Sequence, residues 1–327
     1  MSERRERILV TGGAGFIGSH LVDLLLERPN TDVTVLDKLT YAGTRVNLTE
    51  HEGDPRFTFV LGDVAEADTV LPLVEQADHV VHAAAESFVD RSIEDSRAFV
   101  VSNVLGTQVV LEACRETGTP MTFVSTDEVY GANTAEGLFD EGDPFRPRSP
   151  YAASKAGADL LCHAYVVTYC THVATVRGTN TFGPRQHPEK AIPRFVLAAL
   201  DERPLPVYGR GEQRREWLYV RDFVRAIATV LESGEPGGAY NIGGGHELTN
   251  LDLARQVCAF VGAEHSLISF VPDRPGHDFR YGVKWDRLAR LGWSPATSFE
   301  DGLAITVAWY REHRDWVEAI LQGSPAR

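Results

Sequence analysis

Hydrophobic residues in the first half of the chain alternate between short runs and longer segments with helical spacing. The short runs, which are typical of buried strands, are Ile8–Val10, Val33–Leu36, Phe57–Leu61, His79–His82 and Met121–Val124. The segments with helical spacing are Ser19–Glu27, Glu94–Thr117 and Tyr151–Tyr169. Strands that alternate with helices in this way predict an α/β fold with a doubly wound, parallel Rossmann sheet.

The pattern changes at Thr179, where proline and glycine become frequent. Segments Thr179–Lys190 and Pro272–Tyr281 are predicted as loops. The elements expected between and after them are helices at Ala191–Leu200, Asp222–Glu232 and from Asn250, and strands around Val207 and at Ala239–Ile242. We therefore predict two interleaved domains. The first spans residues 1–178, with segments at about 214–243 returning to it, and a smaller α/β domain takes up most of 179–327.

A glycine-rich segment, Thr11–Gly18, lies between the first strand and the first helix. Its GxxGxxG spacing allows a tight turn, so backbone amides and the helix N-terminus can face a pyrophosphate. The second strand ends in Asp37, nineteen residues after Gly18, where a carboxylate would bind an adenosine ribose. The same carboxylate would repel a 2′-phosphate, which favours NAD over NADP, although Lys38 weakens this preference. The alternative is that Asp37 is an ordinary turn residue.

Small residues follow the third and fourth predicted strands, at Gly62–Val64 and Ala83–Ala85. Small side chains at the carboxyl end of a strand let a flat cofactor approach the backbone. Ligands of doubly wound sheets bind at these strand ends. We therefore predict that residues 1–178 form an NAD-binding domain.

The segment Ser125–Gly131, which follows the fifth predicted strand, contains the adjacent carboxylates Asp127 and Glu128. Carboxylates are rarely buried without partners, so two of them at the end of a core strand indicate a site. Tyr151 and Lys155 lie one turn apart at the start of the following helix, where an ammonium group would lower the pKa of a phenol. This arrangement makes Tyr151 a candidate base. The alternatives are a chance YxxxK spacing and a carboxylate pair that only caps the next element.

Composition narrows the possible partners. The chain has 327 residues, 43% of them hydrophobic, and a net charge of -14, which argues against binding to a nucleic acid backbone. The four cysteines form no CxxC pair, so we expect reduced thiols in a cytoplasmic protein. The eleven histidines are scattered, and we expect no metal site. The charged N-terminus precedes an apolar run that is too short for a signal peptide, and no stretch reaches transmembrane length.

The chain resembles the extended short-chain dehydrogenase/reductase family through TGGAGFIG, the strand-end residues Asp37 and Asp63, and YAASK. Within that family it is most similar to the dTDP-glucose 4,6-dehydratases. The matching segments span nearly the whole chain: DKLTYAG, AAESFVDRSI, STDEVYG, HPEKAIP, EWLYVRD and DRPGHDFRY. The Thr-Asp-Glu triplet is the most specific of them, because the related epimerases and decarboxylases usually lack the Asp-Glu pair.

This resemblance implies a lyase that dehydrates a nucleotide-diphosphate hexose to a 4-keto-6-deoxy sugar. Tyr151, with its pKa lowered by Lys155 and by the nicotinamide cation, would take the C4 hydroxyl proton while the C4 hydride passes to NAD. Thr126 would bind that hydroxyl, Glu128 would remove the C5 proton, and Asp127 would protonate the departing C6 hydroxyl. The hydride would then return to C6, with a proton delivered to C5, so that NAD is regenerated in place. Two neighbouring carboxyl groups suit this chemistry, because one must start neutral and the other ionised.

The resemblance also implies the binding residues. The cofactor-binding set is Gly12, Gly15, Phe16, Ile17, Gly18, Asp37, Lys38, Thr40, Gly43, Asp63, Val64, Ala83, Ala85, Ser125, Tyr151 and Lys155. The substrate-binding set, which would surround the sugar and the diphosphate, is Ser87, Thr126, Asn180, Glu189, Lys190, Arg215, Asn250, Arg274, His277 and Tyr281. Cations in the second set could neutralise a diphosphate, whereas each arginine taken alone could be a solvated surface residue.

The departures from the dehydratase pattern cluster near the expected sugar. The segment NTFGPRQ is closer to epimerases and UDP-glucuronate decarboxylases, and Phe88 replaces a frequent histidine. An added Arg185 could suit a carboxylated sugar. The second hypothesis is therefore a UDP-glucuronate decarboxylase or a nucleotide-sugar 4-epimerase that uses the same oxidation by Tyr151.

A third hypothesis is a dinucleotide-sensing protein that has the fold without the chemistry. It predicts a gap in the set Thr126, Tyr151 and Lys155, and the sequence has none. The resemblance also implies a homodimer formed through two helices of each subunit. Glu94–Thr117 and Tyr151–Tyr169 have apolar residues on more than one face, although helices buried in a core would show the same pattern.

Overall fold

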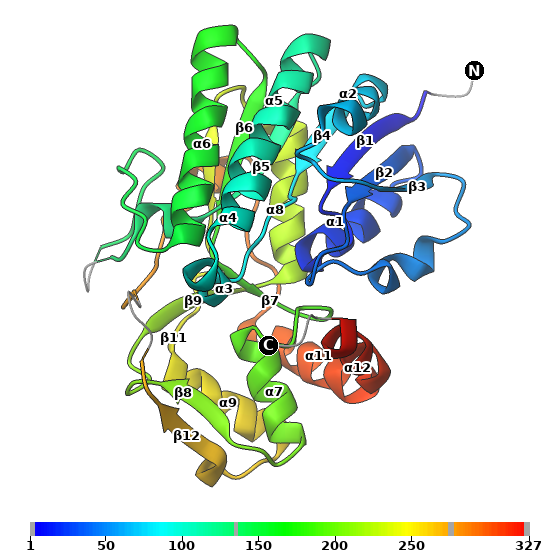
Figure 1. The fold of residues 1–327 in the computed structure, drawn as a ribbon. Coiled ribbons are helices and arrows are strands. Elements are labelled where there is room, and N and C mark those ends of the chain that lie inside the picture. Colours follow the sequence, from blue (N-terminus) through cyan, green and yellow to red (C-terminus); the bar gives the residue numbers. More distant parts are fainter. Residues whose placement is uncertain (1–3, 134–136, 274–277, 324–327) are drawn as a thin grey trace.

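A seven-stranded parallel sheet forms the first lobe of the molecule (Figure 1). The computed structural model describes residues 4–133, 137–273 and 278–323. The strand order is β10-β6-β5-β4-β1-β2-β3, and all neighbours in it are parallel. Its strands are β1 Glu6–Thr11, β2 Thr31–Asp37, β3 Phe57–Leu61, β4 His79–His82, β5 Met121–Thr126, β6 Val173–Gly178 and β10 Ala239–Ile242. The predicted doubly wound α/β fold is confirmed.

Helices cover both faces of this sheet. Helices α1 (Phe16–Leu26) and α8 (Val220–Ser233) pack together on one face. The opposite face is covered by α2 (Ala67–Gln76), α5 (Gly106–Thr117) and α6 (Pro150–Tyr169). Shorter helical segments are the 3-10 helices Arg45–His51 and Asp127–Tyr130, α3 Val89–Glu94, α4 Arg97–Phe99 and a π-helical turn at Val100–Leu105.

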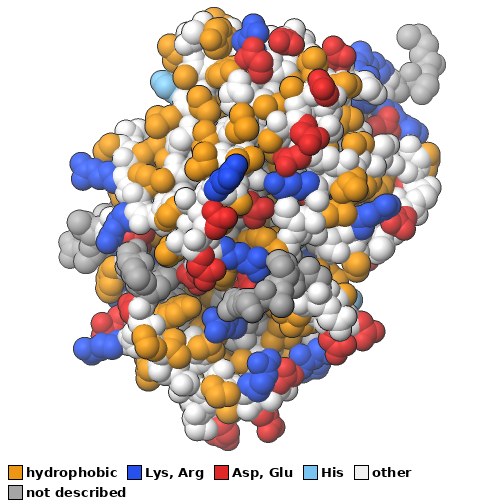
Figure 2. All heavy atoms as spheres, viewed as in Figure 1, with side chains coloured by type: hydrophobic (Ala, Val, Ile, Leu, Met, Phe, Trp, Pro, Cys, Tyr) orange, Lys and Arg blue, Asp and Glu red, His pale blue; other side chains and the backbone are white. Residues whose placement is uncertain are grey.

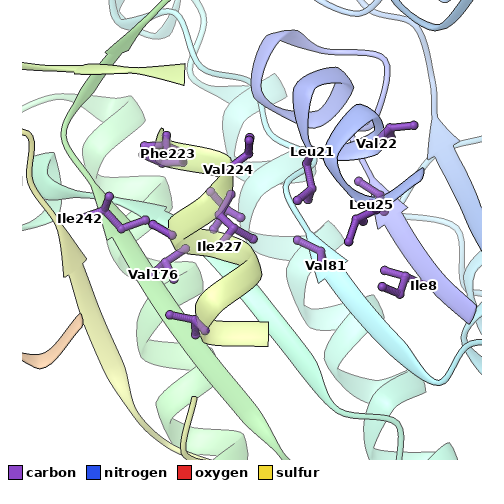
Figure 3. Close-up of a cluster of buried hydrophobic side chains, with 14 of the residues drawn as sticks. Ile8, Leu21, Val22, Leu25, Val81, Val176, Phe223, Val224, Ile227 and Ile242 are labelled. Atoms are coloured by element: carbon purple, nitrogen blue, oxygen red, sulfur yellow. The ribbon is translucent and has the colours of Figure 1, made fainter. Parts of the chain in front are cut away.

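The strand pleat divides the core between the two faces. Ile8 on β1 and Val81 on β4 pack with α1 and α8, around Leu21, Val224 and Ile227 (Figure 3). Their neighbours Leu9 and Val80 point to the other face, where they join a second buried cluster. Successive side chains of a strand point to opposite faces, and both faces of this sheet are covered, so the strands are nearly continuous hydrophobic runs.

The second lobe has its own sheets and core. A three-stranded sheet has the order β11-β9-β7, and β12 pairs in parallel with β8. Its strands are β7 Asn180–Phe182, β8 Leu205–Tyr208, β9 Arg214–Tyr219, β11 Glu247–Thr249 and β12 Ile268–Val271. Its helices are α7 Ala191–Leu200, α9 Asn250–Val261, the 3-10 turn His265–Leu267, α11 Phe299–Glu312 and α12 Arg314–Gly323. Helix α10 (Asp286–Arg290) packs instead against β10 of the large sheet, and its Leu288 belongs to the core of the first lobe. Phe182, Leu253 and Tyr310 lie in its buried core.

Some predicted boundaries were wrong. The continuous helix expected at Glu94–Thr117 is interrupted, since α3 ends at Glu94 and the helical path restarts at Arg97. The segment Thr179–Lys190, predicted as a loop, contains β7. Within the segment expected to return to the first domain, α8 and β10 do pack with the large sheet, whereas β9 belongs to the second lobe. In the part of the chain that the structure describes, no helix has both the length and the apolar character to cross a membrane.

Candidate active site

A cavity of about 320 Å³ opens at the carboxyl ends of the parallel strands, between the two lobes. Its walls come from the loops after β1, β2, β4, β5 and β6, and from the first turn of α7. The predicted residues that line it are Gly12, Gly15, Phe16, Ile17, Gly18, Asp37, Lys38, Thr40, Gly43, Val64, Ala83, Ala85, Ser87, Ser125, Thr126, Asp127, Glu128, Tyr151, Asn180 and Lys190. Residues from both predicted sets thus line one cavity.

The glycine turn after β1 is shaped for close backbone approach. Gly12 has φ +72, and a Cβ atom on it would lie 2.6 Å from the Ala84 Cα. A Cβ atom on Gly18 would lie 2.1 Å from the Gly12 carbonyl oxygen. Any other residue at either position would force the turn apart, which is why the spacing requires glycine here. The resulting concave turn, at the N-terminus of α1, suits a dinucleotide pyrophosphate.

Asp37 ends β2 with both carboxylate oxygens bonded to backbone. Oδ2 accepts from the Ala14 amide at 3.0 Å, and Oδ1 accepts from the Leu39 amide at 2.8 Å. Burial raises the pKa of Asp37, and these two amides oppose that rise. Because the carboxylate is fixed at the cavity wall, it can accept hydrogen bonds from a ribose, so the residues present fit NAD. The Lys38 ammonium group donates to Ser102 Oγ at 2.7 Å and to Asp63 at 3.3 Å.

The end of β5 brings the catalytic candidates together. The Thr126 hydroxyl donates to Asp127 Oδ1 at 3.3 Å and accepts from the Glu128 amide at 3.3 Å. The Thr126 hydroxyl also lowers the pKa of Tyr151, against the rise that burial causes. Ser149 caps α6 by accepting from the Ala152 amide, which fixes Tyr151 in the first turn of that helix. A hydroxyl, two carboxyl groups and a phenol therefore face one end of the cavity.

Asp127 is held in its neutral form. Its side chain is only 2% exposed, and burial raises its pKa to about 8, assisted by the negative charges of Glu128 and Glu216. Its Oδ2 has no hydrogen-bond partner among the described residues. A buried carboxyl group beside other carboxylates favours the protonated state. Asp127 can therefore donate a proton at neutral pH.

Burial shifts the pKa values of both Tyr151 and Lys155. Burial and the Glu128 charge raise the pKa of Tyr151. The Lys155 ammonium group donates to the Val124 carbonyl at 2.7 Å and lies over the Phe123 ring, and burial lowers its pKa to about 8. In the protein alone, burial and Glu128 therefore determine the direction of the Tyr151 pKa shift. The prediction that Lys155 and a nicotinamide cation together lower this pKa stays a prediction.

The substrate-binding candidates divide into groups. Ser87, Asn180 and Lys190 line the cavity, and Lys190 donates to the Ser87 carbonyl at 2.8 Å. Those that do not line it are Glu189, Arg215, Asn250 and Tyr281, and the cofactor candidates Asp63 and Lys155 also lie behind its wall. Arg274 and His277 lie outside the described residues.

The residues behind the wall have other partners. Arg91 donates to Glu189 at 2.9 Å. The Arg215 guanidinium stacks over the Tyr281 ring at 4.4 Å and donates to the Asp278 carbonyl. Arg215 also acts on Asp127 at a distance, since its charge opposes the rise of the Asp127 pKa. Asn250 is the first residue of α9, and its backbone amide donates to the Gln213 carbonyl.

Arg185 has a different place from the one expected. Its guanidinium bonds to Asp23, His20 and the Asn47 carbonyl, and it does not line the cavity. The prediction that Arg185 could face a carboxylated sugar is therefore wrong. The cation is fully engaged with α1 and with the 3-10 helix Arg45–His51.

Sequence reasoning missed several residues of the cavity wall. They include Tyr41, Glu86, Gln186, His187 and Trp217. Tyr41 and Glu86 fall inside segments that were already singled out, and the same is true of Gln186 and His187. Glu86 is a third buried carboxyl group whose pKa burial raises. Its backbone is held by Asn103, which also donates to Ser154 on α6, and only the three-dimensional structure brings these residues together.

Comparisons with known proteins agree with this geometry. The model of the family described as GDP-mannose 4,6 dehydratase matches residues 9–306. The chain is 50% identical to a dTDP-glucose 4,6-dehydratase of an Actinoplanes species, over 95% of this chain and 99% of that one. The crystal structure of DesIV, a dTDP-glucose 4,6-dehydratase from Streptomyces venezuelae with NAD and TYD bound, matches with a TM-score of 0.94 at 48% identity, covering 96% of this chain and 99% of that one.

A related fold serves another reaction. The UDP-glucose 4-epimerase of Thermus thermophilus, in complex with NAD, matches with a TM-score of 0.86 at 34% identity, covering 94% of this chain and 99% of that one. Fold likeness alone therefore does not separate dehydratases from epimerases. The matches extend over nearly the full length of the chain and agree with the glycine turn and the Tyr151 site. The chain belongs to the GDP-mannose 4,6 dehydratase family, within the extended short-chain dehydrogenases/reductases.

Proposed function

We propose that this protein dehydrates a nucleotide-diphosphate hexose, dTDP-glucose, to its 4-keto-6-deoxy derivative, with NAD as a resident cofactor. Relatives named for this reaction match at up to 50% identity over nearly the whole chain. The observation that supports the proposal most strongly is the Asp127–Glu128 pair, where one buried carboxyl group stays protonated beside the negative charge of the other. When bound, NAD supplies reversible oxidation, taking a hydride from C4 and returning it to C6.

The side chains supply the proton transfers. Tyr151 removes the C4 hydroxyl proton, and the Thr126 hydroxyl, which lines the same cavity, orients that substrate group. A C4 ketone acidifies the C5 hydrogen, which Glu128 removes. Asp127 then gives its proton to the C6 hydroxyl, which leaves as water. When the hydride is returned to C6, C5 takes up a proton again, and the protonated Glu128 can supply it. The raised pKa of Tyr151 is compatible with this role, because a cationic nicotinamide ring beside the phenol would favour the phenolate.

The second lobe would bind the nucleotide diphosphate. Lys190 at the cavity wall can offset one phosphate charge, and Arg215 lies behind the same wall. Arg274 and His277 remain predictions for this role. We assign NAD binding to residues 1–178 with the returning parts of 214–243, and sugar-nucleotide binding mainly to 179–327.

The experiment that tests the function starts from purified protein and needs no added cofactor. Incubation with dTDP-glucose should yield a 4-keto product, detected by mass spectrometry as loss of one water. UDP-glucose and UDP-glucuronate serve as parallel substrates. Unchanged dTDP-glucose, with NAD bound to the protein, would refute the proposal.

The decarboxylase or epimerase remains the alternative function, and NTFGPRQ is the sequence feature that favours it. It predicts carbon dioxide release from UDP-glucuronate, or inversion at C4. Neither reaction eliminates water. In neither of them would a protonated Asp127 beside Glu128 have a leaving hydroxyl group to protonate. The engagement of Arg185 with α1 further weakens this alternative.

We also propose that two copies of the chain pair through α5, α6 and the π-helical turn. Val100, Leu160 and Val167 are 52%, 56% and 67% exposed on these elements. Figure 2 shows hydrophobic side chains gathered over this part of the first lobe. Two such faces would be covered by each other in a symmetric dimer. Val167→Glu should yield monomers in light scattering, and an unchanged mass would exclude this interface.

A cytoplasmic location fits the thiols. Cys114, Cys162, Cys170 and Cys258 are all free, and three of them are buried. Oxidising compartments favour disulfides, and the four thiols here form none. We therefore propose a cytoplasmic location.

A further inference from the structure

Arg185 lies in a backbone conformation that needs compensation. Its φ is +63, in the left-handed region that residues with a Cβ atom rarely adopt. The segment 184–190, which contains it, runs from the second lobe along the cavity, and its Gln186 and His187 line the cavity wall. Such conformations persist where surrounding contacts hold them. The contacts of the guanidinium group therefore determine where this segment lies.

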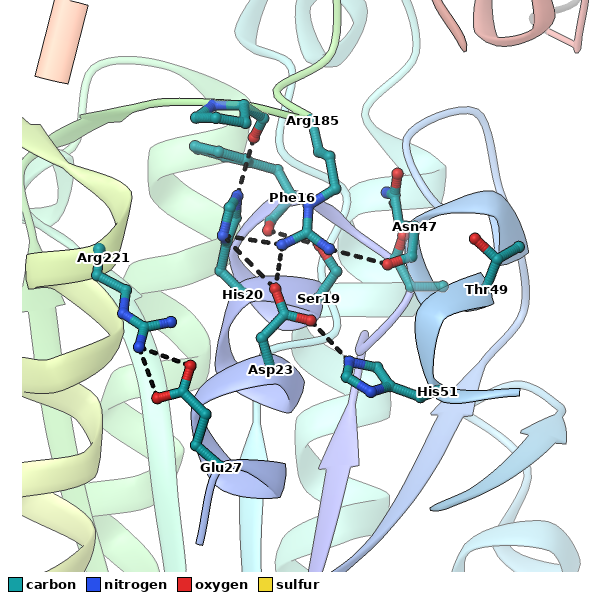
Figure 4. A network of polar contacts seen from close by, with 12 residues as sticks. Phe16, Ser19, His20, Asp23, Glu27, Asn47, Thr49, His51, Arg185 and Arg221 are labelled. Atoms are coloured by element: carbon teal, nitrogen blue, oxygen red, sulfur yellow. Dashed lines mark hydrogen bonds and ion pairs between the residues drawn. The ribbon is translucent and has the colours of Figure 1, made fainter. Parts of the chain in front are cut away.

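The guanidinium has three partners, all on the NAD-binding lobe (Figure 4). It forms an ion pair with Asp23 on α1 and donates to the Asn47 carbonyl at 2.9 Å. It also lies 2.9 Å from His20 Nδ1. His51 bonds to the other oxygen of Asp23 at 2.7 Å, which fixes the carboxylate from behind.

His20 is a neutral acceptor in this network. Its Nε2 lies 2.9 Å from the Pro184 carbonyl, which can only accept, so the ring proton is on Nε2. Its Nδ1 therefore accepts from Arg185. Burial and the Arg185 charge lower the His20 pKa to about 3, which keeps the ring neutral. His20 thus holds segment 184–190 twice, through Pro184 and through Arg185.

Asn47 continues the network to the glycine turn. Its side-chain amide donates to the Ala14 carbonyl at 2.9 Å and accepts from Trp316 at 2.9 Å. The Ala14 amide in turn donates to Asp37 Oδ2 at 3.0 Å. An unbroken series of contacts therefore joins Arg185, Asn47, Ala14 and Asp37, which are all buried or half-buried.

The far end of segment 184–190 is held separately. Arg91 donates to Glu189 at 2.9 Å, and Lys190 donates to the Ser87 carbonyl at 2.8 Å. The segment is thus tied to the first lobe at both ends, and Arg185 provides the tie nearest to the glycine turn. Loss of that tie would free the segment beside the cofactor and would leave the other end in place.

We infer that Arg185 is a positioning residue that couples segment 184–190 to the pyrophosphate turn and so sets how long the protein retains NAD. An enzyme that reuses one cofactor within each turnover needs slow cofactor release. If NADH dissociates before the hydride is returned, the oxidised sugar cannot be reduced and the turnover is not completed. This inference goes beyond the chemistry proposed above and rests only on NAD binding.

The test compares Arg185→Gln with Arg221→Gln. Arg221 on α8 forms an ion pair with Glu27 at the end of the same helix α1, at 2.6 Å. Among the described residues its side chain forms no hydrogen bond with Asn47 or Ala14, and it acts on His20 only through its charge, so it is the matched control. Each protein is loaded with NADH, and its release is followed by fluorescence. We expect release from Arg185→Gln to be about tenfold faster than from wild type. Arg221→Gln should match wild type.

Further readouts separate positioning from a general structural role. Saturating NAD should restore the turnover of Arg185→Gln, since the catalytic groups are untouched. Arg185→Lys keeps the charge but cannot contact all three partners at once, so its release rate should fall between the other two. If Arg185→Gln does not fold, Arg185→Lys is compared with Arg221→Gln in the same way. Equal release rates from the Arg185 variant and the control would overturn the inference, whatever the sugar substrate proves to be.

Discussion

The two ends of the cavity differ in how their polar groups are satisfied. At the glycine turn, the Asp37 carboxylate accepts hydrogen bonds from two backbone amides. The surrounding atoms leave no room for a side chain at Gly12 or Gly18. At the end of β5, Ser125 Oγ and Asp127 Oδ2 are buried without a hydrogen-bond partner among the described residues. The binding end is complete in itself, whereas the reactive end leaves groups available to a substrate. Leaving a buried polar atom unpaired is costly, so the unpaired Asp127 oxygen beside Glu128 indicates a group that is held available for a substrate.

Replacing the phenol at the reactive end should have the largest effect. Tyr151→Phe removes the base and should lower kcat by about a thousandfold. The NAD content of the purified variant should stay at the wild-type level, because the glycine turn is unchanged. Steady-state assays with dTDP-glucose and a nucleotide count on the same sample check both expectations. If the variant lost activity only because it lost NAD, Tyr151 would act in cofactor binding, and the two ends of the cavity would not have separate roles.

Asp127→Asn should separate the two half-reactions. The amide cannot donate an acidic proton to the C6 hydroxyl, so water loss should slow by about a hundredfold, while C4 oxidation is less affected. Enzyme-bound NADH should then accumulate, which its absorbance reports in a stopped-flow trace. Equal slowing of oxidation and water loss would count against Asp127 as the acid.

A change at the binding end should act on affinity. Asp37→Asn keeps one acceptor but loses the charge, and it should weaken NAD binding by about tenfold and reduce discrimination against NADP. Turnover at saturating NAD should be close to wild type. Titration calorimetry with both cofactors measures the change. A large loss of kcat at saturating NAD would show that the two ends are not separable.

The smallest expected effect is a shift of the pH profile. Asp127 must be protonated to act, and its pKa is raised to about 8, so kcat should fall as the pH rises through about 8. Glu216 is one of the charges that raise this pKa, and Glu216→Gln should move the alkaline limb to lower pH. The limb should stay in place in Arg221→Gln. An unmoved limb in Glu216→Gln would mean that another group controls it.

The sequence predicted the binding end better than the reactive end. The glycine spacing and Asp37 depend on local geometry, since a turn between a strand and a helix needs glycine wherever the backbone must approach a ligand. The state of Tyr151 could not be predicted in this way. It depends on burial and on the charge of Glu128, which the three-dimensional structure places near the phenol.

Arg185 shows the same limit. From its neighbours in the chain it could face the sugar, but its partners come from α1 and from residue 47, more than a hundred positions away. Side chains that assemble from distant elements leave no spacing signal in the sequence. The parallel sheet, in contrast, follows from the hydrophobic pattern of each strand, and it was predicted correctly.

The central claim is that Asp127 begins the reaction protonated beside a charged Glu128. Infrared difference spectroscopy of wild type against Asp127→Asn, with NAD bound, observes this directly through the stretching band of a protonated carboxyl group. The account predicts such a band at pH 7, which disappears in Asp127→Asn and fades in wild type as the pH rises past about 8. A wild-type spectrum at pH 7 in which Asp127 contributes only ionised carboxylate bands would contradict it.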